Sequence, residues 1–313
     1  MDKITLGRTN LTTTAAGLGT GGASRIGIAK YGTEHASSIV RTAYDAGVRF
    51  FDSAEVYRTE EALGNGLVGI PRDEYVLSSK FRYEDDDGEL ITPLALSQKL
   101  DDSLRRLRTD TIDIFHIHGV APEHYKKAAE LFVPVLQKAK KDGKIRAIGI
   151  TERFGSDTTH EMLKMALADD FFDSVMVGYN ILNPSAADTI FPITREKNVT
   201  VLCMFAVRTA LSHPEQLKVD IGRILEKKQG DPSILSLEGT LDFLMENGIA
   251  ESIMEAAYRF ARHTSGIHVT LTGTGSAEHL LDNIRAINAP PLPESVLKKL
   301  SEMFGKVDCI SGQ

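Results

Sequence analysis

Short apolar segments alternate with longer segments of helical period along most of the chain. The apolar segments are rich in Val, Ile and Leu, and some are apolar on both faces, as in Ile145-Arg146-Ala147-Ile148-Gly149-Ile150. Such segments are typical of parallel strands that are covered on both sides. Eight of them alternate with helical segments, which predicts βα units and a parallel sheet. The predicted strands end near Thr20, Asp52, Lys80, His118, Thr151, Asn180, Phe205 and Thr272.

The helical segments between these strands carry recognisable start and stop signals. Thr92-Pro93 provides an N-cap followed by proline in the first turn. Gly47 follows the first helical segment in the position of a C-cap. The predicted helices are 34–46, one that begins at 92–93, 124–141, 157–168, 185–197, 277–286 and an extra C-terminal helix at 293–304.

Two segments do not follow the alternation of strands and helices. Residues 4–6 and 11–13 flank Gly7-Arg8-Thr9-Asn10, which predicts a β-hairpin before the first barrel strand. Residues 208–249 are longer than an ordinary βα connection, and long loops of barrels usually lie on the functional face. No domain boundary interrupts the chain. We therefore expect residues 1–313 to form a single α/β domain, a (β/α)8 TIM barrel with an N-terminal hairpin.

The composition is that of a globular protein and argues against nucleic-acid and membrane partners. The chain has 313 residues, of which 42% are hydrophobic and 25% charged, as in a globular protein with a large core. The net charge of −7, without a basic run, argues against a nucleic-acid partner. No signal-peptide pattern and no apolar run of about 20 residues is present, so we expect a cytoplasmic protein without membrane contact. Cys203 and Cys309 form neither a disulfide framework nor a metal-binding spacing, and we expect Cys203 to be a small core residue.

Three successive predicted strands end in ionisable residues. Val48–Phe51 is followed by Asp52 and, five residues later, by Tyr57; the next two strands end in Lys80 and His118. The C-terminal ends of barrel strands open onto one face, where active sites lie. Each residue taken singly has an ordinary structural explanation, such as a helix cap or a solvated lysine. Together, an acid, a phenol, an amine and an imidazole at one face can transfer protons, which predicts a catalytic set.

The segments that carry these residues resemble the motifs of the aldo-keto reductase superfamily over nearly the whole chain. Residues 47–57 resemble the first signature of the family, 111–118 the strand that ends in its catalytic histidine, and 143–150 the strand that leads to the nicotinamide. Residues 273–276 with Asn283 resemble its adenosine-phosphate region. The resemblance implies a (β/α)8 barrel that binds NAD(P)(H) across its C-terminal face without a Rossmann domain. The chain is most similar to the aldose and galactose dehydrogenase branches and to reductases of small aldehydes.

Each member of the catalytic set has a chemical role in such a reaction. Tyr57 would be the general acid or base, and the nearby Lys80 ammonium would lower the pKa of its phenol from about 10. Asp52 would compensate the buried charge of Lys80. His118 would hydrogen-bond to the carbonyl and orient it. His116 points to the same side of the strand as His118 and serves as a comparison, with a catalytic part less expected.

The resemblance also implies which residues contact the cofactor. The implied residues are Gly19, Thr20, Gly21, Thr151, Met204, Phe205, Val207, Arg208, Thr274, Gly275, Ser276, His279 and Asn283.

Several of these positions depart from the pattern of the family. Glu152 stands where an asparagine commonly follows residue 151, Met176 aligns with a glutamine, and Met204 aligns with a stacking aromatic residue. A carboxylate cannot donate a hydrogen bond as an amide does, so recognition of the carboxamide is less typical here. No Lys or Arg stands at Gly273, Gly275 or His279, where NADP-preferring members usually carry one. NAD(H) or dual use is therefore slightly favoured over strict use of NADP(H).

The sequence thus predicts an NAD(P)(H)-dependent oxidoreductase that acts on a small polar carbonyl or a sugar, as a monomer or small homo-oligomer. The polar loops at 25–31, 84–87, 120–124 and 208–249, in a chain without tryptophan, favour such a substrate over a steroid. One alternative is a cofactor-binding regulatory subunit of the same fold, similar to potassium-channel β-subunits, with little turnover. Another is a metal-dependent hydrolase that uses Asp52, His116 and His118, although we expect no metal site because the phenol and amine would then be unused.

Overall fold

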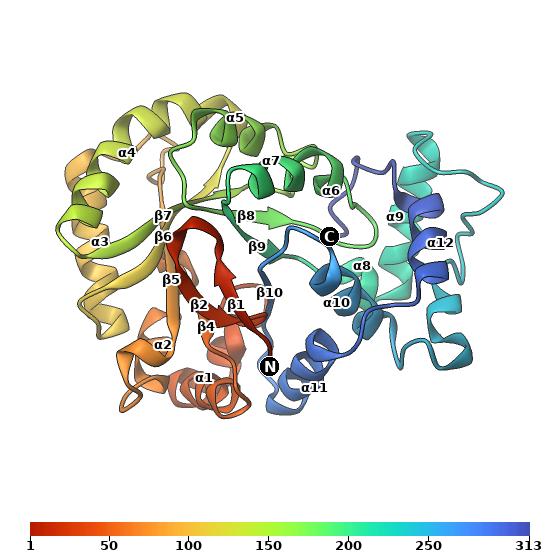
Figure 1. The fold of residues 1–313 in the computed structure, drawn as a ribbon, viewed down its shortest axis with the longest axis horizontal. Helices are drawn as coiled ribbons and strands as arrows, with labels where there is room; N and C mark the ends of the chain where they lie inside the picture. The colour runs from red at the N-terminus through yellow and green to blue at the C-terminus, as the bar shows by residue number, and fades with distance from the viewer.

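The computed structural model describes residues 1–313, and eight parallel strands close into a barrel (Figure 1). Neighbouring strands follow the order β10-β3-β4-β5-β6-β7-β8-β9 around the barrel. Their positions confirm the predicted (β/α)8 fold. The barrel strands are β3 (Ala16–Gly19), β4 (Phe50–Asp52), β5 (Val76–Arg82), β6 (Ile112–Val120), β7 (Ile145–Glu152), β8 (Ser174–Gly178), β9 (Thr200–Met204) and β10 (Val269–Thr272).

Helices surround the barrel, and most of them match the predicted segments. Thr92 caps α3 as expected, because its hydroxyl accepts a hydrogen bond from the backbone N–H of Ala95 at 3.2 Å. No helix is both long enough and apolar enough to cross a membrane. The helices are α1 (Ile28–Asp45), α2 (Glu60–Gly66), α3 (Pro93–Leu107), α4 (Tyr125–Lys141), α5 (Glu161–Asp169), α6 (Ala186–Thr189), α7 (Phe191–Glu196), α8 (Thr209–Ser212), α9 (Pro214–Glu226), α10 (Ile253–His263), α11 (Ala277–Asn288) and α12 (Glu294–Phe304).

The helices differ from the sequence-based expectation in three ways. The single helix predicted at 185–197 is divided into α6 and α7, because Pro192 has no N–H to donate and its ring crowds the preceding turn. Helix α1 begins at Ile28, before the predicted start, and bends at Gly32, where φ is 85°. Helices α8 and α9, inside the long segment at 208–249, and helix α10, between this segment and β10, were not predicted.

The predicted hairpin covers the N-terminal end of the barrel. It consists of β1 (Lys3–Leu6) and β2 (Leu11–Thr14), which pair antiparallel and lie across the barrel strands in Figure 1. Leu6 is fully buried and packs with Phe50, Val76 and Ile114, whose side chains point into the barrel. The hairpin thus closes the end opposite to the face where the strands terminate.

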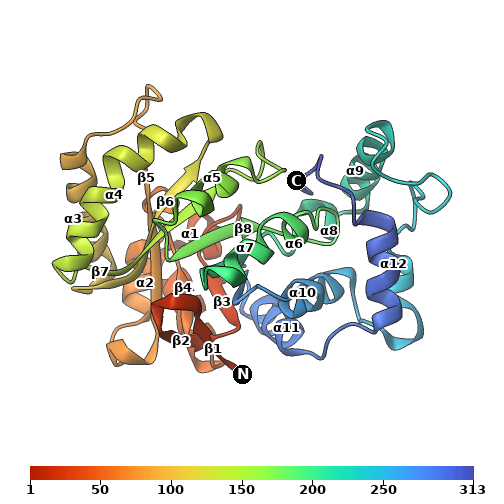
Figure 2. The ribbon, with the colours of Figure 1, turned by 45° about the horizontal axis from the view of Figure 1, so that its top comes forward.

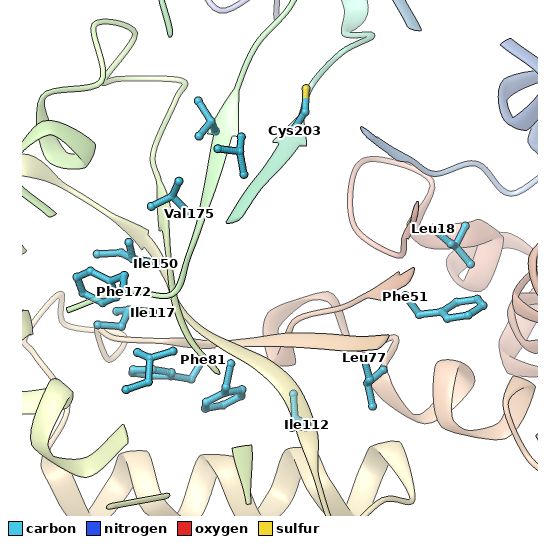
Figure 3. Close-up of a cluster of buried hydrophobic side chains, with 14 of the residues drawn as sticks. Leu18, Phe51, Leu77, Phe81, Ile112, Ile117, Ile150, Phe172, Val175 and Cys203 are labelled. Atoms are coloured by element: carbon cyan, nitrogen blue, oxygen red, sulfur yellow. The ribbon is translucent and has the colours of Figure 1, made fainter. Parts of the chain in front are cut away.

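Side chains alternate between the inside of the barrel and the layer beneath the helices. Phe51, Leu77, Ile117 and Val175 point outward into the large apolar cluster (Figure 3). Cys203 belongs to the same cluster, which confirms its prediction as a small core residue. Their neighbours at the next position along each strand therefore point inward. This alternation is what brings the ionisable strand-end residues into the barrel mouth.

The long segment after β9 builds a second apolar cluster beside the barrel. It contains α8, α9 and a 3-10 helix at Asp242–Gly248. Helix α9 and the C-terminal helix α12 lie side by side in Figures 1 and 2, and both contribute to this cluster. Its contacts extend to Ile181 and Leu182, directly after β8. The segment is therefore anchored to the C-terminal face of the barrel.

Candidate active site

The four predicted catalytic residues meet at the C-terminal face of the barrel. Asp52 ends β4, Lys80 lies near the end of β5, and His118 lies near the end of β6. Tyr57 lies in a short 3-10 helix, Glu55–Tyr57, directly after β4. Its hydroxyl lies 3.3 Å from Nε2 of His118, and the two rings meet edge to face. Nζ of Lys80 lies 5.1 Å from the centroid of the Tyr57 ring.

Lys80 and Asp52 form a buried ion pair. Nζ of Lys80 donates to Oδ2 of Asp52 at 2.5 Å and to the carbonyl of Ser53 at 2.8 Å. The hydroxyl of Ser78 donates to the other carboxylate oxygen at 2.7 Å. Burial alone would lower the pKa of Lys80, but the Asp52 carboxylate and the Tyr57 phenol hold it above its usual value. Lys80 is therefore an ammonium that has no access to solvent.

Tyr57 remains protonated at neutral pH in this environment. Burial raises the pKa of its phenol, and the Lys80 ammonium opposes this rise without overcoming it. The prediction that the pKa of Tyr57 lies below its usual value is therefore wrong. Lys80 does lower this pKa, as predicted, but burial raises it by more. Burial, followed by the charges of Lys80 and Arg153, lowers the pKa of His118 to about 3. His118 is thus a neutral imidazole with one N–H donor.

The turn that carries Tyr57 is held on both sides by polar contacts. The hydroxyl of Thr20 contacts those of Ser53 at 2.9 Å and Thr59 at 2.7 Å, and all three side chains are buried. Glu55 accepts from the backbone N–H of Arg82 and from Nζ of Lys99. The predicted cofactor residue Thr20 therefore has no exposed surface. Its hydroxyl supports the turn of Tyr57.

His116 lies deeper in the barrel than His118. Its ring faces the hydroxyls of Ser78 and Ser174, and a β carbon at Gly149 would lie 2.1 Å from it. Burial and the charge of Lys80 lower the pKa of His116 to about 3. The ring packs as a neutral part of the barrel interior. Because the carboxylate of Asp52 is held by Lys80 and Ser78, these residues do not form the ligand set that a metal-dependent hydrolase would need.

The unusual Glu152 is explained by a partner that the sequence did not reveal. Its carboxylate contacts Nδ1 of His160 at 2.8 Å and accepts from the backbone N–H of Gly178 at 2.7 Å, and the Glu152 and His160 side chains are fully buried. Nε2 of His160 lies 3.1 Å from the hydroxyl of Ser185. Thr151 accepts from the N–H of Gly119 at 2.6 Å. Glu152 therefore ties β7 to α5 and β8.

Aromatic rings connect this buried pair to the predicted cofactor residues after β9. Phe154 stacks on His160 and on Phe205, with centroid distances of 5.4 and 6.3 Å. The guanidinium of Arg208 lies 3.9 Å from the centroid of Phe205. Its Nε donates to the side-chain oxygen of Gln313 at 2.9 Å, while its Nη1 has no partner. Met204 and Val207 are half-buried beside these residues.

The remaining predicted cofactor residues gather where α11 begins. Ser276 caps this helix, and Thr274 accepts from the backbone N–H of Ser276. Two glycines at this end allow close backbone contacts, because a β carbon at Gly273 would lie 2.3 Å from the carbonyl of Gly19 and one at Gly275 would lie 2.8 Å from Gly27.

Two further predicted residues lie on α11 itself. Asn283 donates to the hydroxyl of Thr272 at 2.9 Å. His279 is exposed in the first turn. Most of the predicted set therefore lies in two places, after β9 with Arg208 and on or beside the start of α11, whereas Thr20 and Gly21 lie beside the turn of Tyr57 and Thr151 lies beside Gly119.

A charged cluster at the barrel mouth includes residues of the predicted polar loops 84–87 and 120–124, although its pairs were not predicted. Arg153 donates to Glu84 at 2.9 Å, to the hydroxyl of Tyr83 and to the carbonyl of Gly119. Nδ1 of His124 lies 2.9 Å from the other oxygen of Glu84. The cluster joins loops that are distant in the sequence.

A charged cleft lies beside the turn that carries Tyr57. It has a volume of about 590 Å³ and is lined by charged side chains of both signs, among them Glu55, Arg82 and Lys99. Val56 and Arg58 line it, whereas Tyr57 and His118 do not. The cleft therefore borders the outer side of the turn that presents the phenol.

Comparison with known proteins identifies relatives over most of the chain. A model of the Aldo/keto reductase family matches residues 17–304. L-galactose dehydrogenase of Arabidopsis thaliana is 34% identical over 154 residues, which cover 47% of each chain. Glyoxal reductase of Bacillus subtilis is 38% identical over 133 residues, 42% of this chain and 45% of that one. The chain thus aligns with about half the length of these curated relatives.

Among solved structures, an aldo-keto reductase from Bacillus halodurans in its holo form is similar along its whole length. The TM-score is 0.74, with 99% of this chain and 98% of the other covered. Sequence identity is 21%, so this similarity establishes the fold alone.

Proposed function

Because the chain belongs to the aldo/keto reductase family, we propose that it interconverts a carbonyl compound and an alcohol, with Tyr57 as the general acid or base. The observation that carries the proposal is the arrangement around the Tyr57 hydroxyl. This hydroxyl lies beside a neutral imidazole, and a buried ammonium lies near its ring. The ammonium opposes the rise in the pKa of Tyr57 that burial causes, so it favours the phenolate that proton transfer leaves.

Each of the four residues has a different role in proton transfer. Tyr57 gives its proton to the substrate oxygen during reduction and takes one during oxidation. The Lys80 ammonium stabilises the phenolate that remains, and Asp52 keeps that ammonium charged inside the barrel. His118 presents a neutral N–H donor to the substrate oxygen, which orients the carbonyl next to Tyr57.

The reaction needs a hydride donor, which a nicotinamide cofactor supplies when bound. Two features of the chain fit such a dinucleotide. Arg208 is partly buried and has an unpartnered Nη1, which suits a phosphate oxygen. The start of α11 offers the hydroxyls of Thr274 and Ser276 together with backbone N–H groups.

The recognition of the nicotinamide carboxamide has to differ from the usual pattern. Glu152 is engaged by His160 and Gly178, so we assign the carboxamide contact to Thr151, whose hydroxyl can still donate. Around the start of α11, residues 273–276 contain no Lys or Arg, and His279 is exposed. This composition supports NAD(H) or dual use over strict NADP(H).

The substrate proposed here is a small polar carbonyl or a sugar. The loops at the barrel mouth carry the charged cluster of Arg153, Glu84 and His124, which suits hydroxyl-rich compounds better than apolar ones. Relatives named L-galactose dehydrogenase and glyoxal reductase agree with this class.

Turnover and binding measured on Tyr57→Phe test the proposal. NADH and NADPH are titrated separately by fluorescence, and turnover is measured on a panel of sugars and small aldehydes. We expect kcat to fall by about 10²–10⁴-fold in Tyr57→Phe, with the cofactor Kd unchanged. Tyr44→Phe, which removes a hydroxyl from the outer helix α1, is the matched control. Tight cofactor binding without turnover in the wild type would instead indicate a regulatory subunit.

A further inference from the structure

Gly21 lies against the ring of Tyr57. A β carbon built on Gly21 would lie 2.7 Å from both Cε2 and Cζ of Tyr57 and 3.2 Å from Cδ2. Carbon atoms pack at about 3.5–4.0 Å, so a methyl group at this position cannot coexist with the observed ring. The atoms that it would meet are at the reactive end of the phenol.

The backbone at Gly21 does not itself require glycine. Gly21 is absent from the residues with positive φ, whereas the next residue, Gly22, has a φ of 76° and would place a β carbon in open space. The two adjacent glycines therefore have different reasons to be glycine. At Gly22 the reason is conformation, and at Gly21 it is the tyrosine ring.

The other contacts of the ring leave it in one place. Nζ of Lys80 lies over it, and the ring of His118 meets it edge to face at a centroid distance of 5.4 Å. The turn that carries Tyr57 is fixed by the hydroxyls of Thr20, Ser53 and Thr59. The cheapest response to a methyl group at Gly21 is thus a movement of the Tyr57 ring by roughly 0.8 Å, because the surrounding backbone is held.

We propose that Gly21 is a positioning residue for Tyr57, because the missing side chain creates the space in which the phenol reaches His118. This inference rests on the proposed role of Tyr57 in proton transfer. It gives Gly21 a role beyond contact with the cofactor, as part of the support of the general acid. The segment after β3 then serves the phenol through both Thr20 and Gly21.

The test is Gly21→Ala, with Gly155→Ala as the matched control. Gly155 is exposed, has no positive φ and would place its β carbon in open space. Both proteins are labelled with 3-fluorotyrosine, and the ¹⁹F resonance of Tyr57 is assigned by its loss in Tyr57→Phe. In Gly21→Ala we expect the Tyr57 resonance to shift, the other tyrosine resonances to stay, and kcat at saturating cofactor to fall about 10²-fold. Gly155→Ala should match the wild type.

Two outcomes would overturn the proposal. One is an unshifted Tyr57 resonance in Gly21→Ala. The other is a loss that resides wholly in the cofactor Kd, with kcat at saturation unchanged, because Gly21 would then act on the cofactor. If the wild type turns over no substrate, the proposed function fails, while the ¹⁹F resonance still decides whether Gly21 positions the ring.

A stability measurement covers the case in which Gly21→Ala folds poorly. The cost of this substitution is measured by urea unfolding in the wild type and in Tyr57→Ala. If the methyl group clashes with the ring, the cost disappears when the ring is removed. An equal cost in both backgrounds would place the clash in the backbone and refute the role of Tyr57.

Discussion

Replacing Lys80 by Met tests whether the buried pair behaves as one electrostatic unit. The side chain of Lys80 is 0% exposed and that of Asp52 is 4% exposed, with 2.5 Å between Nζ and Oδ2. At an effective dielectric constant of about 20, two unit charges at this distance attract by roughly 7 kcal/mol. The cost of removing both ions from water, several kcal/mol each, offsets most of that attraction. The intact pair therefore adds little net stability, whereas its disruption is expensive.

We expect Lys80→Met to lower the free energy of unfolding by about 3–5 kcal/mol, because Asp52 would remain as an uncompensated buried charge. In Asp52→Asn/Lys80→Met the loss should be below about 2 kcal/mol, since neither charge remains. Burial raises the pKa of Asp52, so the loss in Lys80→Met should grow as pH rises and the carboxyl ionises.

Urea unfolding followed by circular dichroism measures these differences. Lys138→Met is the control, because Lys138 pairs with Asp142 on the surface, where solvent screens the charges and the same substitution should change the stability little. The reasoning is refuted if Lys80→Met costs no more than the control, or if the double variant loses as much as Lys80→Met alone.

Three further variants or conditions test other parts of the structure. Because the pKa values of His116 and His118 are about 3 in the folded state and about 6.5 when unfolded, the unfolded chain binds more protons between these values. The contribution of the two neutral histidines to the free energy of unfolding should be fully present above pH 6.5. It should fall towards pH 3 by up to about 1.4 kcal/mol per pH unit for each histidine. Urea midpoints measured across this range should depend less steeply on pH in His116→Asn than in the wild type. A β carbon at Gly178 would lie 2.2 Å from Phe154, so Gly178→Ala should lower the stability by about 1–3 kcal/mol in thermal unfolding. Gly155→Ala is the control. A change below about 0.5 kcal/mol in Gly178→Ala, as small as in the control, would contradict the clash. Leu6→Ala should cost about 2–5 kcal/mol in urea because it empties the closed end of the barrel, whereas Leu94→Ala, at a leucine that is 69% exposed, should change little.

The sequence was sufficient to predict the barrel and the meeting of the four residues that we propose to be catalytic. Both follow from short-range pattern, because alternation along a strand decides which side chains point inward and parallel strands end on one face. Asp52, Lys80 and His118 thus reach the same mouth although each lies on a different strand. The break between α6 and α7 could have been predicted from Pro192. It was not, because the apolar positions of 185–197 continue the helical period across the break.

The contacts that the sequence did not reveal depend on how loops fold over the barrel. Arg153 meets Glu84 across 69 residues, and Asn183 donates to the carbonyl of Ile310 across 127 residues. No local pattern encodes such pairs, because the closure of each loop is decided by the packing beneath it. The prediction that the pKa of Tyr57 is lowered was wrong for the same reason. Proximity to Lys80 was predictable, but the degree of burial was not.

The inside of the barrel is divided into layers, and this division bears on how the protein could change over evolutionary time. Near the hairpin the interior is apolar, with Leu6, Phe50 and Ile114. Towards the mouth the interior becomes polar, with the neutral His116, its serine neighbours and the charged pair of Lys80 and Asp52, and Lys80 is the register partner of His116. Stability is thus concentrated at one end and chemistry at the other. Loops around the mouth can accumulate substitutions that alter substrate preference while the apolar end keeps the chain folded, so new specificities can arise in small, individually tolerated steps.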